Sequence, residues 1–209
     1  MRTGLRATAV AAALLIGLTG CAGDALDALD EATGEGDNIS LDATGLSRAL
    51  PRDTDVGDAF QGSAPVTAQG AEAVELCTGR TDAPCEGVTL GGLRETVAGG
   101  SSDQRIDYLL FVFGSQEQAT THVEKMTAGW KKADVQKKRS VKPLTFDSGA
   151  DTTEAFTYSD PEGTNVYMRV GSVVSYVAGS RVSAEKAQEA AKMQADRIRT
   201  IAAGHDPKK

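Results

Sequence analysis

Tyr108-Leu-Leu-Phe-Val-Phe-Gly-Ser-Gln-Glu-Gln-Ala119 is the stretch that decides the fold. It opens with an apolar run, with Ile106 two positions before it, and polar or glycine residues bound the run on both sides. A short run of this kind, rich in aromatic and aliphatic side chains, predicts a central buried strand. Ser115-Gln-Glu-Gln118 then fits a capping box, in which side chains satisfy the free N–H groups of a helix start. We therefore expect a strand that passes into a helix almost without a loop.

The helix that follows Ser115 carries a single apolar stripe. Ala119, Val123, Met126 and Trp130 follow one another at spacings of 4, 3 and 4 residues, which places them on one helical face. We expect Met126 and Trp130 to anchor this face on the sheet. The alternative is a tryptophan that stacks on a ligand.

Strand patterns before and after this stretch complete the predicted sheet. They are a hairpin partner at Val88–Val97 and a meander at Thr153–Tyr158, Asn165–Val170 and Val173–Ala178. Ser183 is a candidate cap for a last helix that ends near Ala203. Strands joined by tight turns are antiparallel. The predicted fold class is therefore α+β, an antiparallel sheet of hairpin plus three-stranded meander with the two main helices packed on one face.

Near the N-terminus, an apolar segment ends with Leu18-Thr-Gly-Cys21. Arg2 and Arg6 lie at its start, and Ala7–Leu18 would span roughly 18 Å as a helix, too little for a bilayer core of about 30 Å. This combination resembles the lipobox of a bacterial lipoprotein. We expect residues 1–20 to be a cleaved signal peptide and Cys21 to be lipidated with acyl chains such as palmitate. The alternative is an ordinary secretory signal with a chance cysteine.

Composition divides the rest of the chain. Residues 21–40 are acidic and small and predict a flexible tether, residues 41–204 predict one domain, and residues 205–209 predict a disordered tail. The chain has 22 Lys and Arg against 29 Asp and Glu, a net charge of −7. Such a protein disfavours nucleic acid as a partner and is repelled by anionic lipid. We expect acyl chains to hold it on the outer face of the bacterial cytoplasmic membrane.

In addition to Cys21, the sequence contains two cysteines, Cys77 and Cys85. Turn residues fill the short loop between them, and outside the cytoplasm such a pair predicts a disulfide. A metal or redox pair is the alternative, but the spacing fits neither a zinc motif nor a CxxC motif, and no histidine stands nearby in the sequence. We therefore expect no metal and no cofactor.

Catalytic motifs are not found in the sequence. His122 has no motif around it, and His205 stands in the predicted tail. No Gly-x-Ser-x-Gly elbow occurs, and the acidic residues between Asp147 and Glu162 surround turns, where carboxylates are usually solvated. We expect a protein without catalytic residues, and a hydrolase is the weakest alternative.

One basic cluster stands out against the acidic background. It could form a patch for an anionic partner such as a phosphate-bearing wall polymer or a lipid headgroup. It could equally be a solvated helix end whose cations complement the helix dipole. The cluster consists of Lys131, Lys132, Lys137, Lys138, Arg139 and Lys142.

The order of the elements resembles the PknH-like extracellular sensor domain of actinobacteria, which occurs on a membrane serine/threonine kinase and on free-standing lipoproteins. The resemblance covers roughly residues 41–203 and rests on Tyr108–Ala119, Trp130, Tyr167-Met-Arg-Val-Gly-Ser-Val-Val174 and the last helix. It implies an α+β domain with a groove for an unidentified ligand. Members often carry further cysteines near the tryptophan and in the last strand, whereas this chain has none after Cys85.

The function expected from these observations is that of a membrane-anchored extracytoplasmic lipoprotein that binds or senses a small molecule. The alternative is an interaction lipoprotein that recruits a protein or cell-wall partner. The first predicts a groove of mixed lining between sheet and helix, and the second predicts a filled core with a flat basic face.

Overall fold

The computed structural model describes residues 39–207, apart from residues 58, 82, 100, 137–139 and 160–161. These residues belong to the second of two compact units, Gly36–Lys209, and the first unit is Met1–Glu35. The predicted signal peptide, Cys21 and most of the tether lie outside the described residues. None of the helices in the described part combines the length and hydropathy needed to span a bilayer.

The described residues form four helices and eight strands. The helices are α1 (Ala43–Ala49), α2 (Ala71–Arg80), α3 (Gln116–Gln136) and α4 (Ala184–Ala202). The strands are β1 (Phe60–Gly62), β2 (Val66–Gln69), β3 (Val88–Ala98), β4 (Ser101–Phe113), β5 (Val141–Pro143), β6 (Thr152–Tyr158), β7 (Gly163–Val170) and β8 (Val173–Ser180).

The strands form one antiparallel sheet in the order β1-β3-β4-β8-β7-β6-β5, and β2 also pairs with β3. The hairpin of β3 and β4 and the meander of β6, β7 and β8 are both present, as predicted. Pairing between β4 and β8 joins these two parts. The α+β class is therefore confirmed, and β4 lies in the interior of the sheet.

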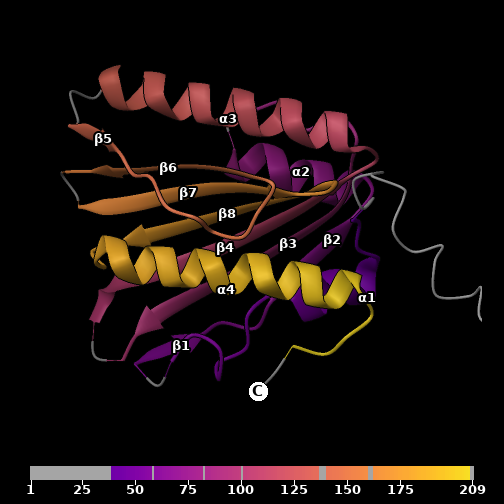
Figure 1. The fold of residues 1–209 in the computed structure, drawn as a ribbon, viewed down its shortest axis with the longest axis horizontal. Helices are drawn as coiled ribbons and strands as arrows, with labels where there is room; N and C mark the ends of the chain where they lie inside the picture. Colours follow the sequence, from indigo (N-terminus) through magenta and orange to yellow (C-terminus); the bar gives the residue numbers. More distant parts are fainter. Residues whose placement is uncertain are drawn as a thin grey trace, which may run out of the picture. The chain divides into compact units, whose positions relative to one another are not determined.

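Helices cover both faces of the sheet, so the predicted packing of both main helices on one face is wrong. The even-numbered residues of β4 from Ile106 to Val112 share a core with α1 and α4, whereas Leu109, Phe111 and Phe113 share a second core with α2 and α3. Figure 1 shows α4 in front of the strands and α3 separated from it by the sheet. The physical reason is that side chains alternate between the faces of a strand, and in β4 both sets are apolar.

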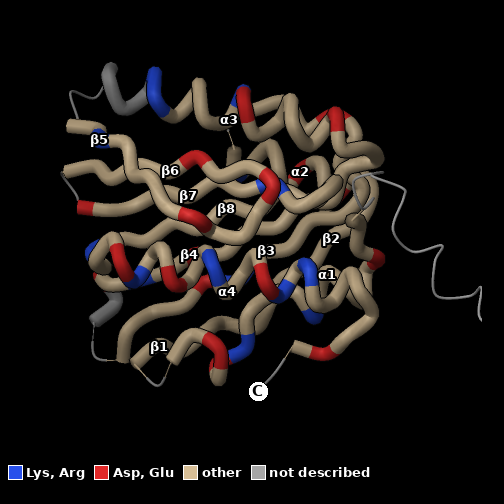
Figure 2. The backbone as a smooth tube through the Cα atoms, viewed as in Figure 1, with Lys and Arg blue, Asp and Glu red and all other residues tan. Residues whose placement is uncertain are grey.

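The two main helices begin at the predicted caps. Ser115 Oγ accepts a hydrogen bond from Gln118 N at 3.2 Å, and Ser183 Oγ accepts one from Lys186 N at 3.3 Å. α4 buries a stripe of alanines together with Ile198. Its other side carries interspersed acidic and basic residues (Figure 2), as expected for a helix with one solvated face.

Both ends of the domain make contacts beyond the predicted boundaries. The carbonyl of Ile39, which the sequence assigns to the tether, accepts a hydrogen bond from Ser172 N at 2.8 Å, and Ile39 packs against the core beneath α4. At the other end, Arg48 donates to the carbonyl of His205 at 3.1 Å and forms an ion pair with Asp206. The first residues of the predicted disordered tail therefore lie against α1.

Candidate functional site

A groove of about 370 Å³ lies between α3 and the strands β6 and β7. Its α3 residues follow one another at spacings of three and one, which is a single face of the helix, next to the predicted apolar stripe. The lining consists of Thr120, Val123, Glu124, Thr127, Ala128 and Lys131 from α3, Thr152 and Glu154 from β6, and Arg169 from β7.

Arg169 is the buried cation on the sheet side of the groove. Its side-chain Nη1 donates to Asp151 Oδ2 and to the carbonyl of Gly171, each at 3.1 Å. The residue is 9% exposed, and its Nε has no hydrogen-bond partner among the described residues. Because an unpaired buried donor costs free energy, a ligand acceptor at this edge of the guanidinium would be favourable.

Thr127 supplies a second unused polar group from the opposite side. It is 4% exposed, and its Oγ1 has no hydrogen-bond partner in the described part of the chain. Val123, one turn earlier on α3, is buried and contributes apolar surface to the same lining. The residues that line the groove therefore combine apolar surface with two buried polar atoms that have no hydrogen-bond partner among the described residues.

An ion pair lies at the edge of the groove. Lys131 Nζ is 3.2 Å from Glu154 Oε2, with side chains 54% and 48% exposed. Exposed pairs of this kind contribute about 0–1 kcal/mol, so a ligand can separate them at little cost. Glu124, also exposed, adds a second carboxylate to the lining.

Asp151 fixes the position of Arg169. Besides its pair with Arg169, it accepts a hydrogen bond from Gly171 N at 2.8 Å and one from Arg199 Nη2 at 2.5 Å. The sequence places Asp151 among solvated turn carboxylates, but the structure gives it two arginine partners. This contact links α4 to β7 across the chain, which is why no local pattern indicates it.

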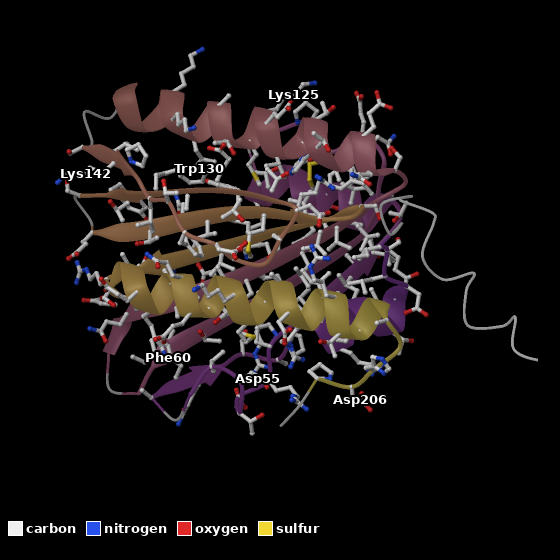
Figure 3. All side chains as sticks on the ribbon, viewed as in Figure 1. Asp55, Phe60, Lys125, Trp130, Lys142 and Asp206 are labelled. Atoms are coloured by element: carbon white, nitrogen blue, oxygen red, sulfur yellow. A yellow bond between two sulfur atoms is a disulfide. The ribbon has the colours of Figure 1, made fainter. Side chains whose placement is uncertain are left out.

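The basic cluster is only partly described. Lys131, Lys132 and Lys142 are exposed, and Lys137, Lys138 and Arg139 lie outside the described residues. Lys142 belongs to β5, at an edge of the sheet (Figure 3), and not to the end of α3. The anionic-partner patch therefore stays a prediction, although Lys131 belongs to the groove.

Trp130 packs against the core beneath α3, as the anchor interpretation predicts, and does not line the groove. Figure 3 shows it on the side of α3 that faces the sheet. Its ring centroid is 6.3 Å from that of Tyr176, which stacks on Tyr167 with centroids 4.8 Å apart. Met126, one turn earlier, is fully buried.

Cys77 and Cys85 form the predicted disulfide, which connects α2 to the loop before β3. His122 of α3 lies beside it, 2% exposed, with Nδ1 at 2.8 Å from the carbonyl oxygen of Pro84. Its ring is also 4.9 Å from that of Phe113, centroid to centroid. Sequence reasoning gave His122 no partner because this contact joins segments far apart in the chain.

No protein-family model and no curated protein sequence matches the chain. Among solved structures, the extracellular domain of PknH from Mycobacterium tuberculosis is similar to it, with a TM-score of 0.55 and 15% sequence identity. The match covers 77% of this chain and 97% of that one. At this identity the similarity concerns the fold, and that fold is the one implied by the sequence resemblance.

Proposed function

We propose that this protein is an extracytoplasmic sensing module that binds a small molecule in the groove between α3 and β6–β7. The observation that carries the proposal is that two residues lining one groove, Arg169 and Thr127, each hold a buried polar atom, Nε and Oγ1, without a hydrogen-bond partner among the described residues. Native structures satisfy nearly all buried polar groups, so two unsatisfied ones in residues that line the same groove favour a binding site. The extracytoplasmic location is supported by the similarity to an extracellular domain and by the N-terminal sequence.

The lining defines the chemistry of the ligand. A carboxylate or phosphate oxygen would accept from Arg169 and from the hydroxyl of Thr127. An apolar part of the ligand would lie along Val123, and a hydroxyl or ammonium group would meet the carboxylates of Glu124 and Glu154. The groove volume is near the lower end of the range for ligand sites, which favours a small metabolite or a single wall fragment.

The lipid anchor is part of the same proposal. Cys21 follows a short apolar segment and small residues, and acyl chains on this residue would hold the acidic domain at the membrane surface. Residues between Cys21 and Ile39 would then separate the domain from the lipid. A sensor in this position would meet ligands released at the membrane or the cell wall.

The test is a thermal-shift screen with carboxylate- and phosphate-bearing wall fragments, lipid headgroups and metabolites. A ligand present at 100 times its Kd contributes about 2.7 kcal/mol, which raises the Tm of a domain of this size by roughly 5–10 °C. Ala128→Trp places a large side chain in the groove from an exposed position. Thr121→Trp, on an exposed part of α3 outside the lining, is the matched control.

We expect the shift to disappear in Ala128→Trp and to persist in Thr121→Trp. Arg169→Met should also weaken binding, because it removes the cation that faces the ligand oxygen. A screen without any stabilising compound, or a shift that Ala128→Trp leaves unchanged, would contradict binding in this groove.

A further inference from the structure

The disulfide and His122 bring together three metal-ligand side chains that the sequence keeps apart. One ligand atom each from Cys77, Cys85 and His122 lies within 4.8 Å of the other two, and all three residues are buried. In the sequence, the spacing of the two cysteines does not fit a zinc motif, and no histidine stands near them. The fold supplies that histidine from α3.

The hydrogen bonding of His122 leaves a ring nitrogen ready for a metal. The carbonyl oxygen of Pro84, 2.8 Å from Nδ1, can only accept, so Nδ1 carries the hydrogen. In the neutral ring, a hydrogen on Nδ1 leaves the lone pair on Nε2. Nε2 has no hydrogen-bond partner among the described residues. Metal-binding histidines commonly donate their other N–H to a carbonyl in this way.

Thr81 lies beside both sulfur atoms. Its hydroxyl donates to the carbonyl of Cys77 at 3.0 Å, and its oxygen is 3.7 Å from Cys77 Sγ and 3.6 Å from Cys85 Sγ. The oxygen is therefore left as an acceptor next to the two sulfurs. Together with two sulfurs and one imidazole nitrogen, it gives the cluster four potential ligand atoms.

We propose that reduction of the Cys77–Cys85 disulfide converts this cluster into a binding site for one thiophilic divalent cation, Zn²⁺. A dithiol reductant passes two electrons and two protons to the disulfide, which leaves two thiols and an oxidised dithiol. Binding of the cation then releases both thiol protons. Two thiolates and Nε2 would be the ligands, and water or the Thr81 oxygen would complete the tetrahedron.

The change in geometry is small. Zinc lies about 2.3 Å from sulfur and about 2.0–2.1 Å from nitrogen, so tetrahedral coordination needs the two sulfurs about 3.8 Å apart. Once the S–S bond is broken, side-chain rotation can provide this separation, because the two Cα atoms are 6.0 Å apart. The site would thus be closed while oxidised and open to metal while reduced.

The experiment uses the full chain with Cys21→Ser in detergent, so that Cys77 and Cys85 are its only cysteines. The protein is titrated with Co²⁺ and Zn²⁺ in anaerobic buffer before and after reduction with a phosphine. Visible absorption of Co²⁺ reports thiolate ligation and tetrahedral geometry. Competition with Zn²⁺ gives its affinity, and circular dichroism monitors the fold.

Only the reduced protein should bind one equivalent of metal and show the thiolate absorption. Replacing an outer-shell residue commonly weakens metal binding 10–100-fold, so loss of a direct ligand in His122→Phe should raise the Kd by about 100-fold or more. His205→Phe, which changes the other histidine, should leave the Kd unchanged.

Three outcomes would overturn the proposal. They are no metal uptake by the reduced protein, equal uptake by the oxidised protein, and an affinity that His122→Phe does not change. If reduction unfolds the domain, Zn²⁺ should restore its circular dichroism, and failure to do so would also count against the site.

Discussion

The Arg197→Met substitution tests whether one buried guanidinium holds α1 to α4. Arg197, on α4, is 4% exposed and donates to the carbonyls of Arg48, Ala49 and Leu50 at the end of α1, the last two at 3.3 and 3.1 Å. It also forms an ion pair of 2.8 Å with Asp55. Helix ends leave carbonyls without intrahelical partners, and here one side chain satisfies three of them. Methionine keeps an apolar stem of similar length and removes every one of these bonds.

The magnitude follows from what remains after the substitution. The carbonyl of Ala49 keeps its bond from Gln194 Nε2 at 3.0 Å, and Asp55 keeps its bonds from Arg52. The carbonyls of Arg48 and Leu50 lose the guanidinium. An orphaned buried acceptor costs about 1–3 kcal/mol, and breaking a buried ion pair costs about 3–5 kcal/mol. Because Asp55 retains a partner, we expect a loss of about 3 kcal/mol.

Urea unfolding followed by circular dichroism measures this loss. With a slope of about 2 kcal/mol per molar urea, the midpoint should fall by about 1.5 M. Arg199→Met is the matched control, because Arg199 lies two residues later on α4 but its side chain is 40% exposed in its pair with Asp151. The control should lose at most about 1 kcal/mol. Equal losses in the two variants would refute the argument that burial of the guanidinium decides the effect.

The pH dependence of the same variant provides a second check. Burial raises the pKa of Asp55, but hydrogen bonds from Arg52 and the charges of Arg197 and Arg52 outweigh burial, so the pKa lies below its ordinary value. A carboxylate with a lowered pKa stabilises the fold above its unfolded pKa of about 3.9, and this contribution is lost as pH falls through the folded pKa. Arg197→Met should therefore lose less stability than the wild type between about pH 4.5 and 2.

Three further predictions concern the cysteines and His122. Replacing Cys77 and Cys85 together with alanine should lower the free energy of unfolding by about 2.5 kcal/mol, from the loop entropy of a separation of 8 residues; unchanged urea midpoints would contradict this. Cys21→Ser should abolish metabolic labelling with palmitate and change the fractionation of the protein, and continued labelling would refute Cys21 as the site of lipidation. Burial lowers the pKa of His122 below the unfolded value of about 6.5, so the unfolded state gains protons first and wild-type stability should fall as pH drops from 7 toward 5. His122→Phe should flatten this dependence and His205→Phe should not.

The elements with strong local signals could be predicted from sequence. The buried strand through Tyr108–Phe113 and the caps at Ser115 and Ser183 depend on neighbouring residues, and the structure confirms all three. β2 and β5 were not predicted, because both are short and poorly patterned. β5 even contains Lys142, which sequence reasoning grouped with the end of a helix.

The sequence contains a signal that argues against packing both main helices on one face of the sheet. A strand covered on one face alternates apolar and polar residues, but the run from Tyr108 to Phe113 is apolar at every position. That pattern indicates a central strand, and it also requires cover on both faces. In the structure, the helical stripe at Ala119–Trp130 and the alanine stripe of the last helix each cover one of these faces.

The groove residues could not be identified from sequence for a different reason. Thr127 and Arg169 are single polar residues within amphipathic elements, and their significance is that each is buried with an atom left unpaired. Burial of this kind depends on which strand lies beneath which helix turn. The same is true of His122, which becomes a candidate ligand only when α3 packs on the disulfide loop.

The two faces of the sheet differ in how closely their helices approach, and this difference explains where the groove lies. α4 rests on fully buried alanines such as Ala191 and Ala195, and its backbone packs more closely on β7 and β8 than that of α3 does. Distances between packed elements grow with the side chains between them. α3 rests on Met126 and Trp130, larger side chains that leave room for a groove next to Thr127. The face covered by α4, where Arg197 joins α4 to α1, therefore contributes stability. The face covered by α3 has the space for a ligand.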